Sequence, residues 1–96
     1  MRLRNSFWAL IGRDVSETPQ VVIERIRKAM LFALDEHCSN DHYALDLKIT
    51  FARDVAELWY LRPDLMYAIA ASKNQTVAEQ SIADISTLFK GHFNAG

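Results

Sequence analysis

A proline inside a long helical pattern, in the stretch 54–71, is the feature that most constrains this fold. Apolar residues recur on both sides of Pro63 at the spacing of an amphipathic helix. A proline removes one backbone donor from a helix and disfavours the helical conformation of the residue before it. The sequence therefore predicts two helices, over 41–61 and 63–73, that meet near Arg62.

Two further helices are predicted from their start signals. Thr18 can cap a helix with its hydroxyl group, and Pro19 at the first helical position needs no N–H partner. This start, followed by apolar residues at helical spacing, predicts a helix over 19–37. The segment Thr76-Val77-Ala78-Glu79 matches a capping box and predicts a helix over 76–90.

The segment 43–51 fits two patterns. Every odd position is apolar, which is typical of a half-buried strand. Leu47, Phe51, Val55 and Leu58 also follow helical spacing. We prefer a helix, because only residues 6–11 could pair with such a strand and a two-stranded ribbon alone is marginally stable. An α+β fold with a strand at 43–51 is the alternative.

Together these patterns predict an all-α fold, a small bundle of about four helices. A short helix over 5–11 is a further candidate. A chain of 96 residues points to a single domain, here 1–96. Half of the residues are apolar, so some apolar side chains must stay on the surface of so small a body. Since a contiguous exposed apolar patch often marks an interface, we expect self-association, with a homodimer as its simplest form.

Composition argues against several classes of protein. The net charge of −1 and the absence of a large basic cluster are unlike a nucleic-acid binder. No apolar run approaches the roughly 20 residues of a membrane span. Cys38 is the single cysteine and cannot form an internal disulfide, so a reducing, cytoplasmic setting is expected.

The candidate site is a protein interface. Tryptophan, tyrosine and arginine dominate binding hot spots, and they cluster around the proline. The other interpretation is that Trp59 joins the core and the tyrosines lie at its edge. The segment 29–34 is apolar nearly all round, as expected for a helix buried on several sides or packed against a second copy. The candidate interface residues are Trp59, Tyr60, Arg62, Tyr67, Leu31 and Phe32.

Two alternatives rest on other residues. His37, Cys38 and His42 lie close together in the sequence and raise a thiol or metal site at 37–42. Zinc sites usually draw on two ligand pairs, so an ordinary helix terminus is the simpler interpretation. The segment 1–13 carries the basic residues Arg2, Arg4 and Arg13. They suggest an alternative function, a small regulator that contacts nucleic acid through its basic N-terminus.

No pattern in the chain assigns a reaction or a cofactor. Phosphate-binding loops, nucleophile elbows, zinc-protease motifs and dinucleotide fingerprints are all absent from the sequence. The sequence therefore favours a non-enzymatic protein–protein interaction module without cofactor or metal, whose protein partner the residues do not name. We expect it to self-associate through an apolar helical surface.

Overall fold

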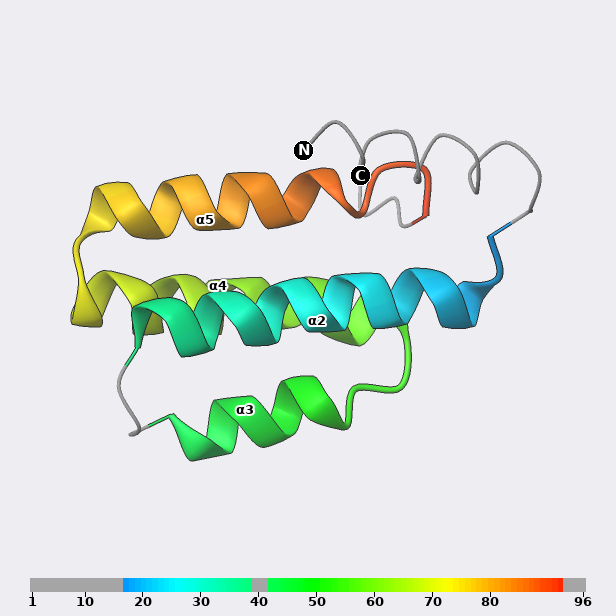
Figure 1. Cartoon of the computed structure of the whole chain (residues 1–96), viewed down its shortest axis with the longest axis horizontal. Coiled ribbons are helices and arrows are strands. Elements are labelled where there is room, and N and C mark those ends of the chain that lie inside the picture. Colours follow the sequence, from blue (N-terminus) through cyan, green and yellow to red (C-terminus); the bar gives the residue numbers. More distant parts are fainter. Residues whose placement is uncertain (1–16, 39–41, 93–96) are drawn as a thin grey trace, which may run out of the picture.

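The computed structural model describes residues 17–38 and 42–92, and these form four helices (Figure 1). The helices are α2 (Pro19–His37), α3 (Tyr43–Thr50), α4 (Val55–Ser72) and α5 (Gln75–Thr87). The all-α class and the helix over 19–37 are confirmed. The strand considered at 43–51 is wrong, since this segment is α3. The short helix considered at 5–11 lies outside the described residues.

The helices pack in an up-down-up-down arrangement. α2 and α4 run in the same direction in the middle of the bundle, and α3 and α5 flank them in the opposite direction (Figure 1). The central helices contact each other, and each of them also contacts both flanking helices. No helix in the described ranges is long and apolar enough to cross a membrane.

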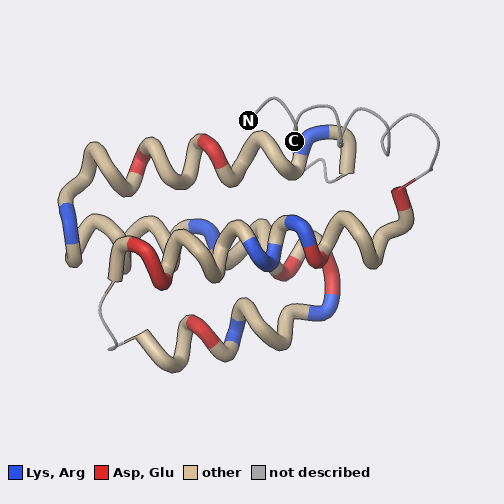
Figure 2. Tube along the Cα trace, viewed as in Figure 1, with Lys and Arg blue, Asp and Glu red and all other residues tan. Residues whose placement is uncertain are grey.

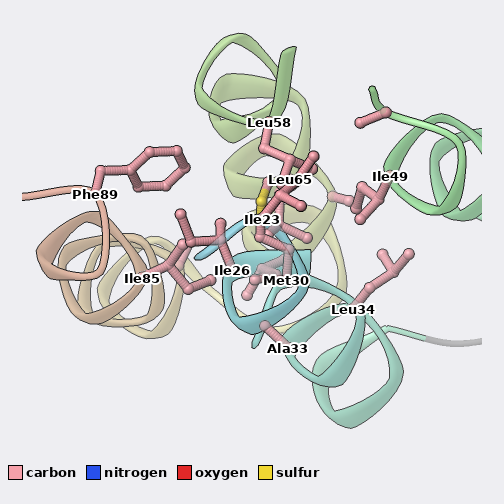
Figure 3. Close-up of a cluster of buried hydrophobic side chains, with 14 of the residues drawn as sticks. Ile23, Ile26, Met30, Ala33, Leu34, Ile49, Leu58, Leu65, Ile85 and Phe89 are labelled. Atoms are coloured by element: carbon pink, nitrogen blue, oxygen red, sulfur yellow. The ribbon is translucent and has the colours of Figure 1, made fainter. Parts of the chain in front are cut away.

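The core lies where the apolar faces of the four helices meet (Figure 3). Helices α2 and α4 supply most of it, and a phenylalanine from the turn after α5 closes one side. Burying one such side chain fully stabilises the fold by about 1.5–3 kcal/mol. The largest fully buried side chains are Ile26, Met30, Ile49, Leu58, Leu65, Ile69 and Phe89.

Helix α2 begins as its sequence predicts. The Thr18 hydroxyl accepts a hydrogen bond from the Val21 N–H at 3.2 Å, and Pro19 opens the first turn. The start of α5 was predicted wrongly at Thr76. Asn74 caps this helix instead, because its side-chain oxygen accepts from the Val77 N–H at 2.8 Å.

The end of α5 also differs from the prediction. The helix stops at Thr87 rather than at residue 90. The chain continues in tight turns, with the N–H groups of Leu88 and Phe89 donating to carbonyls three residues earlier. These turns bury Phe89, and Gly91 follows with a φ of 80°, a conformation that favours glycine.

The predicted continuous helix over 41–61 is wrong, because the chain leaves the helix after Thr50. Arg27 of α2 explains where α3 ends. Its Nη1 donates to the carbonyl oxygens of Ile49, Thr50 and Ala52 at 2.8, 2.7 and 3.0 Å. Carbonyls at the end of a helix need such external donors. An arginine from a neighbouring helix therefore caps α3.

A new helix then starts at Asp54. The Asp54 side chain accepts a hydrogen bond from the Glu57 N–H at 2.9 Å, as an N-cap residue does. The Glu57 carboxylate accepts from the Arg53 N–H at 2.6 Å. Asp54 and Glu57 thus form a start signal three residues apart, which separates α3 from α4.

The predicted boundary between 41–61 and 63–73 is also wrong, since α4 runs through Pro63. Proline has no N–H to donate to the Trp59 carbonyl one turn earlier. The Arg62 side chain replaces that donor, with its Nε 3.1 Å from the Trp59 carbonyl oxygen. Arg62 Nη1 also donates to Ser86 Oγ of α5 at 2.8 Å. The same arginine therefore supports the helix at the proline and joins α4 to α5.

Candidate interaction surface

Large apolar side chains gather on the outside of α3 and α4. Seven large apolar side chains are exposed in the part of the chain that the structure describes. Two of them, Val21 and Phe32, lie on α2. We call the remaining five the α3–α4 face. They are Tyr43, Leu47, Phe51, Tyr60 and Tyr67.

A groove runs between α3 and α4 beside this face. One part has a volume of about 510 Å³ and is lined by Phe51, Tyr60 and Leu61, among others. The other part has a volume of about 300 Å³, and Tyr67 is among its lining residues. Lys48 of α3 lines both parts, so the two lie end to end. We call them together the α3–α4 groove.

Helix α4 presents one stripe of residues to this groove. Ala56, Tyr60, Asp64, Tyr67 and Ala71 all line it, at spacings of four, four, three and four residues. Residues at these spacings share one face of a helix. The apolar residues on the opposite side of α4 are buried in the core, which keeps the stripe directed outward.

Charges of both signs border the apolar lining. Lys48 comes from α3, and the acidic residues Asp54, Glu57 and Asp64 come from the start and middle of α4. Within the described ranges, neither Lys48 nor Asp64 has an ion-pair partner within 4.0 Å. Figure 2 shows that acidic and basic residues are both distributed along the described part of the chain.

Two of the six candidate interface residues are half-buried and contact each other on α4. The Arg62 guanidinium carbon lies 3.3 Å from the centroid of the Trp59 ring, which is a cation–π contact. The Trp59 ring meets Phe89 edge-on, with centroids 5.0 Å apart. Burial lowers the pKa of Arg62, which is consistent with a partly desolvated cation. Trp59 and Arg62 therefore link α4 to the chain around α5.

The other four candidates are divided between two surfaces. Tyr60 and Tyr67 are 69% and 78% exposed and line the groove. Leu31 is half-buried against the core, whereas Phe32 is 67% exposed on α2. The structure thus brings together Tyr60 and Tyr67 and leaves Phe32 away from the residues that line the groove.

Sequence reasoning missed Phe51 and Lys48 as groove residues. Phe51 was expected on the apolar stripe of an unbroken helix, but the turn after α3 leaves it 72% exposed. The start signal formed by Asp54 and Glu57 could have revealed this break. Lys48 carried no local signal, because its position depends on how α3 packs beside α4.

The residues of the thiol or metal alternative lie at the end of α2 and just before α3. His37 and Cys38 are half-buried at the end of α2, and His42 is half-buried just before α3. Among the described residues, no group of three or more His, Cys, Asp or Glu side chains could hold a metal ion. Residues 39–41 and the basic segment 1–13 lie outside the described part.

Comparison with known proteins adds no relative. No protein-family model, curated protein or solved structure matches the chain.

Proposed function

We propose that this protein is a non-enzymatic protein–protein interaction module that self-associates through an apolar helical surface. The observation that carries the proposal is the α3–α4 face, where five large apolar side chains are exposed on neighbouring elements. Three of the five, Phe51, Tyr60 and Tyr67, line one groove, and contiguous exposed apolar surface on a small protein often marks an interaction site. This face also has a groove beside it, into which side chains of a partner can pack.

The chemistry of the face supports a protein partner. Tyrosine offers a large aromatic surface for contact and a hydroxyl group that can form a hydrogen bond. Tyr43, Tyr60 and Tyr67 make up most of the aromatic surface here. Lys48 and Asp64 lie among the apolar lining residues, where they can pair with charges of a partner.

Four of the five residues of the face lie on helices, and Phe51 lies in the turn after α3. Tyr60 and Tyr67 belong to α4, whose opposite side carries the fully buried Leu58 and Leu65. A surface that is already ordered loses little conformational entropy on binding.

We infer a cytoplasmic setting for this role, because a lone cysteine gives no disulfide framework.

The test is the molar mass of the full chain as a function of concentration. Light scattering coupled to gel filtration, from about 1 µM to about 1 mM, covers weak and standard interfaces. We expect the mass to rise from 11.0 kDa towards twice that value. A mass of 11.0 kDa at every concentration contradicts the proposal.

A further inference from the structure

We infer that the occupant of the α3–α4 groove is the same face of a second copy, with the two α4 helices antiparallel about a two-fold axis at the level of Pro63 and Asp64. This inference rests on the proposed self-association and names its surface and geometry. Three observations carry it: the residue pattern on α4, the charges beside it and the exposure of the tyrosines.

Four of the five residues in the outward stripe of α4 are placed symmetrically about the bond between Pro63 and Asp64, whereas Asp64 itself has Pro63 as its counterpart. Tyr60 and Tyr67 lie three and a half positions on either side of the bond between Pro63 and Asp64. Ala56 and Ala71 lie seven and a half positions on either side of it. In a two-fold interface the same patch of both subunits must complement itself. An antiparallel pair centred at this bond places each tyrosine opposite the other tyrosine of the second copy, and Ala56 opposite Ala71.

The sizes of these side chains suit close packing of two helices. The tyrosines project from the stripe, and the alanines at its ends leave room for the partner helix to approach. Tyr60 and Tyr67 are about 10 Å apart along the helix axis, at 1.5 Å per residue. One pair of tyrosines therefore forms a contact on each side of the axis, and Pro63 is exposed between the two contacts.

The charges also complement one another about this axis. Lys48 lines both parts of the groove and so lies near its middle, and Asp64 lies next to the axis on α4. A second copy brings one more Lys48 and one more Asp64 to the same region. These four charges cancel one another, and each lysine gains a carboxylate from the other subunit. The other acidic lining residues, Asp54 and Glu57, lie about 14 and 10 Å from the axis along α4, at 1.5 Å per residue, and stay outside this central group.

The exposed side chains of α2 provide a matched control. Phe32 is 67% exposed, close to the 69% of Tyr60, and does not line the groove. Its exposed neighbours include Lys28, Asp35 and Glu36, so it stands among charges rather than in an apolar groove. A substitution at Phe32 therefore changes exposed aromatic surface without touching the inferred interface.

The experiment exchanges the charges and measures dimerisation of the full chain by sedimentation. Lys48→Glu faces Asp64 of the second copy with a like charge, and Asp64→Lys faces Lys48 in the same way. We expect each variant alone to dimerise at least about tenfold more weakly than the unchanged protein. An equimolar mixture of the two variants restores both attractive pairs, so dimerisation returns to near its original strength. The double variant Lys48→Glu/Asp64→Lys restores them within one chain.

Separate measurements test whether the variants fold and whether dimerisation uses the α3–α4 face. Both positions are exposed, so circular dichroism and thermal unfolding should stay close to those of the unchanged protein. We expect Phe32→Ser to leave dimerisation unchanged and Tyr60→Ser to weaken it. If the unchanged protein dimerises but the charge variants do so equally well, this inference is wrong and the proposed function stands. If the unchanged protein is monomeric throughout, the proposed function itself is wrong.

Discussion

The support that Arg62 gives to the helix at Pro63 can be tested with a double-mutant cycle. The three variants are Arg62→Ala, Pro63→Ala and the two combined. In the unchanged protein the Arg62 Nε serves the Trp59 carbonyl, for which Pro63 offers no donor. With alanine at position 63, a backbone N–H is available to that carbonyl. The Trp59 carbonyl then no longer depends on the Arg62 side chain for a donor.

The magnitudes follow from the contacts. Arg62→Ala removes two hydrogen bonds from a charged donor, at 3.1 and 2.8 Å, and the contact with the Trp59 ring. With each such bond contributing about 1.5 kcal/mol in this half-buried place, the free energy of unfolding falls by about 3 kcal/mol. Pro63→Ala should raise it by about 2 kcal/mol, because a proline in a helix costs about 3 kcal/mol and unfolded-state rigidity returns part of that.

The decisive quantity is the coupling between the two positions. In the Pro63→Ala background, Arg62→Ala should cost about 1 kcal/mol less, since the Trp59 carbonyl keeps a partner. Urea unfolding followed by circular dichroism, at a concentration where the chain is monomeric, measures all four free energies. Independent sites add to within about 0.5 kcal/mol. Additivity within that limit would refute the idea that Arg62 serves the carbonyl that Pro63 leaves.

Three other predictions concern stability. Arg27→Ala should lower the free energy of unfolding by about 2–3 kcal/mol in urea unfolding, because three carbonyls at the end of α3 lose their donor; a loss below about 0.5 kcal/mol contradicts this capping. Leu65→Ala should cost about 2–5 kcal/mol by the same measurement, since Leu65 is fully buried; an unchanged midpoint would place Leu65 outside the core. The hydrogen bond from Arg25 lowers the pKa of Glu17 below its ordinary value of 4.5. The ion pair therefore stabilises the fold above that pH, and this stabilisation is lost as the pH falls through the lowered pKa. In acid, the thermal midpoint of Glu17→Gln should therefore approach that of the unchanged protein. A difference in midpoint that stays constant at every pH would refute the linkage.

The parts of the fold with local signals were predictable from the sequence. Thr18 and Pro19 define the start of α2, and the apolar stripe that includes Ile26 and Met30 defines its buried side. The four-helix, all-α class follows from such stripes. The start of α5 was misplaced because Asn74 caps it, although Thr76 two residues later offered a plausible capping box.

The division between α3 and α4 has one local signal, the start of α4 at Asp54 and Glu57, and one cause that is distant in sequence. Arg27 caps α3 from more than twenty residues away, and no local pattern announces that. At Pro63 a local rule predicted a helix end, but the Arg62 side chain and the buried residues on both sides keep α4 intact. A contact distant in sequence thus ends α3, whereas at Pro63 the neighbouring Arg62 side chain and the buried residues of α4 overrode a local preference.

The candidate site was predictable only in part for the same reason. Tyr60 and Tyr67 were chosen for their residue type, and they are exposed beside the groove; their role in an interface stays a prediction. Trp59 and Arg62 were chosen on the same ground but contact each other and the chain around α5. Residue type alone does not distinguish aromatic residues that close a bundle from those that stay on its surface.

The central claim is that two copies meet through antiparallel α4 helices, and cysteine cross-linking tests it most directly. In a Cys38→Ser background, one variant carries Ala56→Cys and another carries Ala71→Cys. About 22 Å separates positions 56 and 71 along the helix axis, at 1.5 Å per residue, so neither variant can link to itself in this dimer. We predict a covalent dimer under mild oxidation only when the two variants are mixed. Cross-linking of each variant with itself, or none in the mixture, would contradict the antiparallel pairing.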